Sequence, residues 1–370
     1  MRHGTTLTAR AGGYGRPVNR TRIAVLLGGR SSEHSISCIS GRSIVAALDA
    51  MDGRGTSYEV SVVGIARDGR WVQDADRGLG ILTQSGPLPE VAVDAPAADL
   101  ATCLAVDAVF PVLHGPWGED GSVQGLLETL AVPYVGSGVL SSAVSMDKGF
   151  MKQALVDAGL RVGPYRVITD RQWRADPVAV VGDLASLGLP VFVKPARAGS
   201  SLGIVKVSDA RLLAEAIESA RKHDPRIVVE AAVVGAREIE CGVLVDSGGI
   251  PRASRCAEII VSARHEFYDF EAKYLDDSAT LVVPADLTEP VEREVQRLAV
   301  AAFDALACDG LARVDFFVTG DEVIVNEVNT MPGFTDISMY PRMWGASGVD
   351  YPELVDRLVK DALRKGTGLH

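Results

Sequence analysis

The chain reads Arg313-Val314-Asp315-Phe316-Phe317-Val318 and then, after Thr319-Gly320-Asp321-Glu322, Val323-Ile324-Val325-Asn326-Glu327-Val328-Asn329. Two apolar runs of strand length around a connection that contains glycine predict a β-hairpin. Side chains alternate between the two faces of a strand, so Arg313 and Asp315 share one face, and Glu327 and Asn329 share one face of the partner strand. The hairpin therefore carries charged and amide groups inside apolar strands.

The length of the connection decides whether these polar side chains meet. A three-residue connection, Gly320 to Glu322, pairs Asp315 with Glu327 and Arg313 with Asn329,. A two-residue connection separates the carboxylates, because a shift of one residue turns every side chain of a strand to the other face. The sequence is compatible with both registers.

Carboxylate and amide oxygens in this pattern suit Mg²⁺, which takes one or two carboxylates and completes its octahedron with waters and substrate phosphates. A magnesium site for a bound nucleotide is therefore the functional interpretation, and a solvated strand face with an ordinary ion pair is the alternative. The segment Thr330–Thr335 favours the functional interpretation, because its Pro332-Gly333 turn can present backbone N–H groups to a reacting centre,.

A second motif, Lys194 to Gly203, is rich in glycine and serine between two segments that read as strands. Small residues let the backbone approach a phosphate, and Lys194 adds positive charge. The flanking strands predict a hairpin rather than a strand-to-helix turn, and the P-loop pattern G-x-x-x-x-G-K-S/T is absent from the chain,. The alternative is a flexible hairpin tip without a ligand.

The N-terminal part predicts an open parallel sheet, with strands at 22–27, 58–65 and 105–112,. A helix is expected after Gly28-Gly29, so Glu33 lies at the carboxyl end of the first strand, where open α/β sheets bind ligands. His114 follows a later strand in the same way. Glu33 could hold an ammonium group or simply complement the helix dipole, and a lone histidine is more often structural. Further helices are expected over 123–130, 141–155 and 289–306.

Length and composition bound the possible functions. The 370 residues exceed the size of one core, so two or three domains are expected, and the formal net charge of −11 excludes a general polyanion binder,. No apolar run approaches the roughly 20 residues of a membrane span. Five scattered cysteines favour a reduced, cytoplasmic compartment,. Residues 1–21 are basic without a signal-peptide apolar core and are expected to form a disordered tail.

Taken in chain order, the motifs resemble the D-alanine–D-alanine ligase family of the ATP-grasp superfamily. The resemblance runs from about Ile23 to the C-terminus, and no single motif carries it. The motifs are Leu27–Glu33, Leu113–Gly121, Ser145–Lys148, Val193–Pro195, Gly199–Ser201, Tyr268–Tyr274, Arg313–Asp315 and Asn326–Gly333. It implies a three-domain α/β ATP-grasp fold with an N-terminal open parallel sheet over residues 22–140, a central lid domain over 141–229 and a C-terminal catalytic domain over 230–370. ATP is then held between the last two.

The resemblance also implies which residues bind ATP and metal. Asp315, Glu327 and Asn329 would hold two Mg²⁺ ions, for which Mn²⁺ can substitute. The phosphates would be contacted by three lysines, Lys148, Lys194 and Lys273, with Ser200, Ser201 and Asn326 nearby. Glu230 and Glu238 would reach the adenine and ribose. Glu240 competes with Glu238 for the ribose, because the segment 234–238 is one residue longer than the family spacing.

For the amino acids, the resemblance implies that Glu33 pairs with the ammonium group of the first D-alanine, with His114 nearby. Ser200 and Tyr274 would link Glu33 to the closing loops. Arg313 and the Gly333 N–H would stabilise the oxyanion. Ser338 and Met339 would border the second D-alanine, and Ser338 would bind its carboxylate.

The implied reaction is ATP-dependent ligation of two D-alanine molecules through a D-alanyl phosphate, which supplies a peptidoglycan precursor. The alternatives are a ligase that makes D-alanyl-D-lactate or D-alanyl-D-serine, and a catalytically silent ATP-binding regulatory protein on the same scaffold. The resemblance favours a cytoplasmic homodimer, although no periodicity in the sequence indicates an interface. Neither a nucleic-acid nor a membrane partner is expected from an acidic chain without basic runs,.

Overall fold

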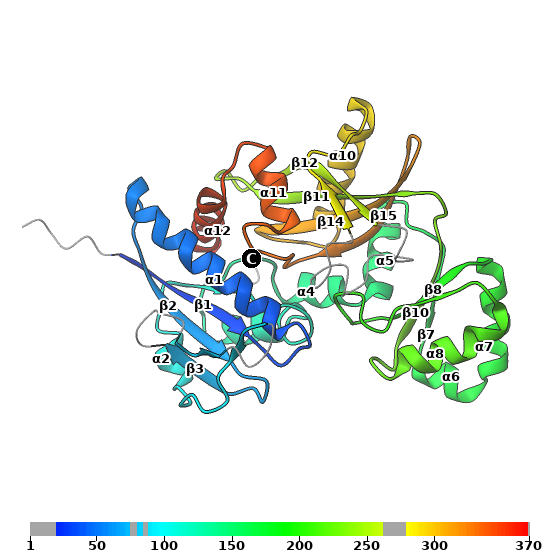
Figure 1. The fold of residues 1–370 in the computed structure, drawn as a ribbon, viewed down its shortest axis with the longest axis horizontal. Helices are drawn as coiled ribbons and strands as arrows, with labels where there is room; N and C mark the ends of the chain where they lie inside the picture. The colour runs from blue at the N-terminus through cyan, green and yellow to red at the C-terminus, as the bar shows by residue number, and fades with distance from the viewer. Residues whose placement is uncertain (1–19, 75–79, 84–87, 262–278, 369–370) are drawn as a thin grey trace, which may run out of the picture.

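The computed structural model describes residues 20–74, 80–83, 88–261 and 279–368 (Figure 1). Within these residues the strands form two four-stranded sheets, one five-stranded sheet and a small two-stranded one made of β4 (Leu82–Thr83) and β5 (Glu90–Val91). The three larger sheets occupy separate lobes, which Figure 1 shows in blue, green and yellow to orange. The site described below lies where these lobes meet.

The first sheet has the order β3-β2-β1-β6, built from β1 (Thr21–Gly28), β2 (Tyr58–Ile65), β3 (Trp71–Asp74) and β6 (Ala108–Pro111). β1 runs parallel to β2 and β6, which confirms the predicted open parallel sheet, and β3 adds an antiparallel edge. Alternate residues of β1 enter two cores. Ile23, Val25 and Leu27 face α1 (His34–Ala50), whereas Ala24 and Leu26 face α2 (Leu100–Cys103) and α3 (Ser122–Thr129),.

The second sheet is antiparallel, with the order β7-β10-β8-β9. Its strands are β7 (Tyr165–Ile168), β8 (Val191–Pro195), β9 (Val205–Val207) and β10 (Ile227–Ala231). The helices α6 (Asp170–Ala175), α7 (Pro177–Leu184) and α8 (Leu213–Arg221) contribute to one core with the sheet. Because β8 pairs directly with β9, the glycine- and serine-rich segment between them is a hairpin connection, as predicted.

The third sheet has the order β13-β12-β11-β14-β15. Its strands are β11 (Arg237–Val245), β12 (Pro251–Val261), β13 (Ala279–Val282), β14 (Leu311–Thr319) and β15 (Glu322–Asn329). The predicted helix over 289–306 is α10 (Glu289–Ala305), and its apolar stripe is buried in a core with this sheet. Residues of α11 (Met339–Ala346) pack with β11 and β12 in two other clusters.

The β14–β15 hairpin combines the two registers that the sequence left open. Its connection has two residues, since Thr319 pairs with Glu322, and Gly320 has the positive φ of 59° that a tight turn uses,. A two-residue connection was expected to separate the carboxylates, and that expectation is wrong. A β-bulge between Asp315 and Phe316 makes Asn326 an extra residue, so Asp315 still pairs with Glu327 and Arg313 with Asn329,.

The single helix predicted over 141–155 is also wrong. The structure has α4 (Val139–Met146) and α5 (Lys148–Asp157), separated at Asp147, whose ψ of 103° is extended. The Asp147 carboxylate accepts hydrogen bonds from the N–H groups of Gly149 and Phe150 and so caps α5,. It also pairs with Arg226 at 3.0 Å. The break places Lys148 at the first turn of a new helix.

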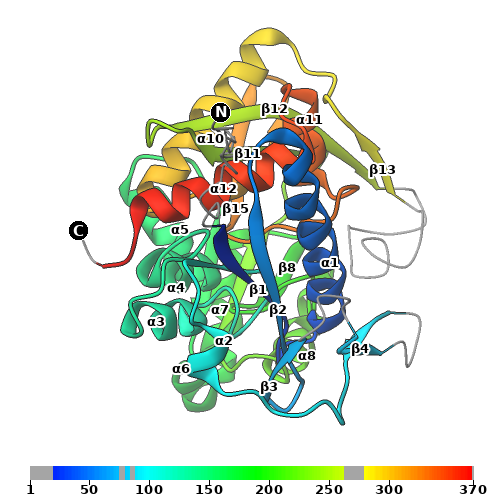
Figure 2. The ribbon, with the colours of Figure 1, turned by 90° about the vertical axis from the view of Figure 1, so that its left-hand side faces the viewer.

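The last helix, α12 (Tyr351–Lys365), returns to the first sheet. Its buried residues Leu354, Leu358 and Val359 share one core with Ile23 and Val25 of β1. Figures 1 and 2 both show α12 beside α1 on this side of the sheet. The N-terminal lobe therefore completes its core with the C-terminal end of the chain.

Two further features bear on the cellular setting. The five cysteines Cys38, Cys103, Cys241, Cys256 and Cys308 are all free and buried. Among the helices in the described part of the chain, none combines the length and apolarity required to span a membrane.

We predict that Asp147→Ala lowers the free energy of unfolding by about 2 kcal/mol, because it removes both a helix cap and the partner of Arg226,. Asp176→Ala is the matched control, since Asp176 caps α7 by accepting from Ala179 N–H at 2.9 Å. It should cost only about 1 kcal/mol. Denaturant unfolding followed by circular dichroism measures both values. Equal losses would show that the Arg226 pair contributes nothing.

Candidate active site

A cavity of about 870 Å³ is lined by residues from all three large sheets and their loops. Almost every candidate residue from the sequence lines it: Glu33, His114, Lys148, Lys194, Ser200, Ser201, Glu238, Arg313, Asp315, Asn326, Glu327, Asn329, Gly333, Ser338 and Met339. Glu230 is not part of the lining. Lys273 and Tyr274 lie outside the described residues. Residues separated by up to 306 positions are thus brought to one site.

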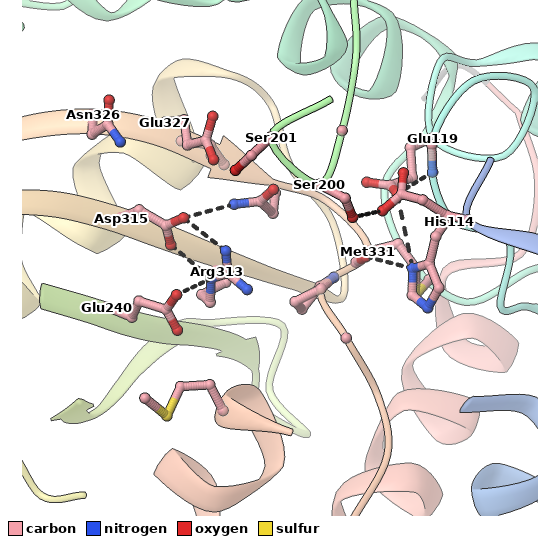
Figure 3. Close-up of a pocket in the computed structure, with 18 of the residues that line it drawn as sticks. His114, Glu119, Ser200, Ser201, Glu240, Arg313, Asp315, Asn326, Glu327 and Met331 are labelled. Atoms are coloured by element: carbon pink, nitrogen blue, oxygen red, sulfur yellow. Dashed lines mark hydrogen bonds and ion pairs between the residues drawn. The ribbon is translucent and has the colours of Figure 1, made fainter. Parts of the chain in front are cut away.

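The β14–β15 hairpin forms the acidic wall of the cavity. Arg313 holds the Asp315 carboxylate with two hydrogen bonds of 2.6 and 2.7 Å, and it lies 3.3 Å from Glu240 of β11 (Figure 3). Burial opposes the charge of Arg313, but the neighbouring carboxylates outweigh burial and raise its pKa well above the ordinary value,. Asn329 donates to Asp315 at 3.1 Å. The guanidinium therefore remains charged and fixed between two acids.

The bases on the opposite side come from α5 and β8. Lys148 donates to the carbonyl of Ala198 at 2.9 Å and lies 3.8 Å from Glu327. Lys194 donates to Glu230 at 2.8 Å. Two ammonium groups are thus held at the cavity wall, one facing the acidic hairpin and one backed by a buried carboxylate. Fixed cations of this kind can neutralise phosphate oxygens.

Glu230 has a position that the sequence did not indicate. Its carboxylate lies behind Lys194 and between two lysines, since Lys152 is 3.3 Å from the other oxygen. Burial would raise the pKa of Glu230, but Lys152 and Lys194 outweigh it and lower the pKa to about 2. Two buried ammonium groups require a counter-ion, which is the physical reason that Glu230 is not at the cavity surface.

The loop between β8 and β9 reaches the N-terminal lobe. Ser200 and Ser201 both have left-handed backbone conformations, with φ of 47° and 58°. Their backbone therefore departs from the extended conformation of the strands on either side. The Ser200 hydroxyl donates to Glu33. Glu33 is packed so closely that a Cβ at Gly115 or Gly199 would lie 2.5 Å from its carboxylate oxygen. These two glycines leave the space that the carboxylate occupies.

His114 is held at both ring nitrogens. Its Nδ1 lies 3.1 Å from the Met331 carbonyl, which can only accept, so Nδ1 carries the proton and Nε2 accepts from Ser40 at 3.1 Å,. Burial lowers the pKa of His114 and favours this neutral form. The histidine is therefore hydrogen-bonded both to Met331 in the loop after β15 and to Ser40 of α1. It lines the cavity beside Glu33.

Glu119 is a cavity residue to which the sequence analysis gave no role, although it lies within the quoted segment 113–121. It accepts from Gly115 N–H at 2.6 Å and lies 3.8 Å from His114 Nδ1 (Figure 3). Burial, together with repulsion from Glu33, raises its pKa to about 8. The proximity of Glu119, which is 15% exposed, to Glu33 was not recognisable from spacing, because tertiary packing alone brings the two acids together.

The start of α11 forms the end of the cavity. Ser338 precedes its first residue, Met339, and the Ser338 hydroxyl is bonded to Thr335, at 3.0 Å from its N–H and 2.7 Å from its hydroxyl. Among the described residues no side chain caps this helix. A Cβ at Gly333 would lie 3.3 Å from the Ser338 hydroxyl, so Gly333 lies beside the start of α11. The free N–H groups and positive dipole of a helix start suit a small carboxylate.

Comparison with known proteins agrees with this architecture over most of the chain. Residues 22–137 match the family described as "D-ala D-ala ligase N-terminus", and residues 154–360 match "D-ala D-ala ligase C-terminus". The chain belongs to the D-alanine–D-alanine ligase family. It is 54% identical to a D-alanine–D-alanine ligase of Streptomyces coelicolor, and the match covers 94% of both chains.

Solved structures of this family have the same fold. The D-alanine–D-alanine ligase from Coxiella burnetii superimposes with a TM-score of 0.76 at 36% identity and covers 94% of each chain. The VanG D-Ala:D-Ser ligase from Enterococcus faecalis also gives a TM-score of 0.76, at 32% identity, over 93% of this chain and all of its own. The ATP-grasp fold expected from the motifs is confirmed.

We predict that, because of Glu119, the free energy of unfolding of this protein falls as the pH rises. Its folded-state pKa of about 8 lies above the ordinary 4.5, so the folded state binds the proton more tightly than the unfolded state,. The stabilising contribution is complete below about pH 4.5 and is lost as the pH rises through about 8. Glu119→Gln mimics the protonated form at every pH and should remove this loss.

Thermal unfolding measured from about pH 5 to about pH 8.5 tests this prediction. The difference in Tm between Glu119→Gln and the parent should grow by about 2 °C or more over this range. Glu215→Gln is the control for loss of one negative charge, because Glu215 is exposed on α8, and it should leave the pH dependence unchanged. Parallel curves for the parent and Glu119→Gln would contradict the prediction.

Proposed function

We propose that the chain joins two D-alanine molecules with the consumption of ATP, through a D-alanyl phosphate, and so supplies a peptidoglycan precursor. The observation that carries the proposal is one cavity lined by a buried carboxylate, a fixed guanidinium and the start of a helix: Glu33, Arg313 and the first residue of α11, Met339. These groups match an ammonium, an oxyanion and a carboxylate, which are the charged parts of the reactants. Family membership supports the same reaction.

ATP would occupy the part of the cavity between β8 and the β14–β15 hairpin. A volume of about 870 Å³ is within the range of nucleotide-sized sites,. Lys148, Lys194 and the backbone of Ser200 and Ser201 would face the phosphates. Glu238 is the better candidate for the ribose, because Glu240 is engaged by Arg313. We also assign Lys273 to the phosphates and Tyr274 to the closing contact with Glu33, on the sequence motif alone.

The donors at the hairpin fit a magnesium site. Among the described residues there is no cluster of three or more His, Cys, Asp or Glu side chains that would hold a metal alone. Asp315 and Glu327 face each other in register, with Asn329 and Asn326 adjacent. Two carboxylates with amide oxygens suit Mg²⁺, or Mn²⁺ in its place, when phosphates complete the shell. Two bound ions would offset the charge that develops on the transferred phosphoryl group.

The amino acids would lie along the remaining cavity. Glu33 would accept the ammonium group of the first D-alanine, in a position fixed by Ser200 and bordered by His114. Ser338 and the first N–H groups of α11 would bind the carboxylate of the second D-alanine, with Met339 beside it. The two substrates would then approach each other next to Arg313.

The reaction would proceed in two displacements. The carboxylate of the first D-alanine attacks the γ-phosphorus of ATP, the bond to the bridging oxygen breaks, and ADP leaves. The amine of the second D-alanine then attacks the acyl carbon, the bond to the phosphate oxygen breaks, and the departing phosphate takes up the proton that the amine loses. Arg313 and the Gly333 N–H would bind the oxyanion formed in this step. Exclusion of water protects the acyl phosphate from hydrolysis.

Several broader assignments belong to the same proposal. The three large sheets support domains at 22–140, 141–229 and 230–370, with α12 packed on the first. The free, buried cysteines support a cytoplasmic location,. A homodimer is proposed from the family resemblance, and nucleic acids are not proposed as partners.

Product analysis tests the proposed function directly. The purified protein is incubated with Mg-ATP and equimolar D-alanine, D-lactate and D-serine, and the products are identified by mass spectrometry. D-alanyl-D-alanine with one ADP per dipeptide is expected. D-alanyl-D-serine or D-alanyl-D-lactate as the main product would favour the alternative ligases, one of which is a structural relative. ATP binding without any product would indicate the silent regulatory alternative.

We predict that Arg313→Lys lowers kcat by about 100-fold to 1,000-fold. Lysine keeps the charge between Asp315 and Glu240 but cannot reproduce the two-pronged guanidinium geometry,. The control is Arg237→Lys, because Arg237 pairs with Glu258 at 2.6 and 2.7 Å on the same sheet without lining the cavity. Steady-state kinetics should show a near-normal kcat for the control. A near-normal kcat for Arg313→Lys would exclude Arg313 from the oxyanion role.

A further inference from the structure

The outer edge of β15 is closed by the segment that follows α4. β15 is the edge strand of the third sheet, so within the described part of the chain one side of its backbone has no neighbouring strand. Val325 N–H donates to the Arg161 carbonyl at 2.9 Å, and Val328 N–H lies 3.3 Å from Met151 Sδ. Between them, the Asn326 carbonyl accepts from Lys152 Nζ at 2.9 Å. At Asn326, the Lys152 side chain thus makes the hydrogen bond that a neighbouring strand would otherwise make.

Asn326 is the residue on which the geometry of the acidic wall depends. It is the extra residue of the β-bulge, since Asp315 pairs with Glu327 and Phe316 with Val325. The two-residue connection at Gly320-Asp321 alone would place Asn326 opposite Asp315 and turn Glu327 to the other face of the strand. The bulge restores the facing carboxylates, and the extra residue it introduces has no partner in the ladder.

Lys152 is a buried lysine outside the cavity, and burial lowers the pKa of its ammonium group although the charge of Glu230 opposes this. Its side chain is 2% exposed and does not line the cavity. Besides Asn326 it lies 3.3 Å from one oxygen of Glu230, whose other oxygen accepts from Lys194 at 2.8 Å. A continuous polar chain therefore runs from the bulge of β15 through Lys152 and Glu230 to a lysine at the cavity wall. It joins the third sheet to the second.

We propose that Lys152 is a positioning residue that holds the bulge at Asn326, so that Glu327 stays on the face of Asp315 and both can bind the metal ions of the nucleotide. Through Glu230 it also orients Lys194. The proposal rests on the metal site of the proposed function and adds a residue outside the cavity to it. Mutation of residues that position metal ligands through hydrogen bonds commonly lowers metal affinity by about 10-fold to 100-fold.

The test compares metal binding in Lys152→Met with the parent protein. Mn²⁺ is titrated in the presence of ADP and free Mn²⁺ is followed by electron paramagnetic resonance, and the Mg²⁺ concentration for half-maximal turnover is measured separately. Both values should rise by about 10-fold or more in Lys152→Met, while the KM for D-alanine stays within about twofold. Lys152→Arg keeps a charged donor and should recover most of the affinity. Lys222→Met removes an exposed lysine and should change nothing.

Two comparisons make the outcome decisive. Glu327→Gln removes a proposed ligand and should weaken Mn²⁺ binding at least as much as Lys152→Met. Lys152→Met still leaves Glu230 paired with Lys194, and circular dichroism verifies that the variant is folded; Lys152→Leu is a second apolar replacement that is read in the same assay,. A folded variant of either type with unchanged Mn²⁺ affinity, or with an equal loss for Mn²⁺ and D-alanine, would overturn the proposal.

The Mn²⁺ titration also separates this proposal from the proposed function. If the parent protein makes no dipeptide but binds Mn²⁺ with ADP, and Lys152→Met weakens that binding, the reaction is wrong and the role of Lys152 stands. If the dipeptide forms and the affinity of Lys152→Met for Mn²⁺ is unchanged, the role of Lys152 is wrong and the reaction stands.

Discussion

Compensation of buried charge is the constraint on which the candidate site depends. Among the described residues six carboxylates and three cationic side chains line one cavity: Glu33, Glu119, Glu238, Glu240, Asp315 and Glu327 against Lys148, Lys194 and Arg313. Arg313 offsets Asp315 and Glu240, the Ser200 hydroxyl and the Gly115 N–H solvate Glu33 and Glu119, and the raised pKa of Glu119 favours its neutral form,. The remaining negative charge is complementary to metal ions and to an ammonium group. The cavity is thus arranged for cationic ligands that accompany an anionic nucleotide.

The sequence predicted much of this arrangement, because the signals were local. Alternation in β14 and β15 placed Arg313 with Asp315 and Glu327 with Asn329, and the structure brings these pairs together. The parallel first sheet, the β8–β9 hairpin and α10 were also predicted correctly. The motifs identified the family, and the comparisons confirm it. Apolar periodicity and glycine-rich turns were sufficient for these conclusions.

The remaining features depend on contacts between distant segments. The bulge at Asn326 could not be read from the length of a turn, because Lys152 stabilises the extra residue from another part of the chain. At the helix break, Asp147 caps α5 and also pairs with Arg226, which lies 79 residues away and could not be identified from the local sequence. The two lysines that enclose Glu230 could not be predicted either, because spacing does not show which side chains meet. In each case a buried charge found its partner through tertiary structure.

The packing of α12 on the first sheet has a consequence for biosynthesis. Ile23 and Val25 are among the first described residues to leave the ribosome, yet the core they enter includes Leu354, Leu358 and Val359. Domains usually fold in order from the N-terminus during translation. Here the N-terminal lobe can form its strands and α1 early, but part of its apolar face stays open until the last helix has been synthesised. Its completion therefore waits until α12 has left the ribosome, and a chain that lacks α12 would expose this face to chaperones.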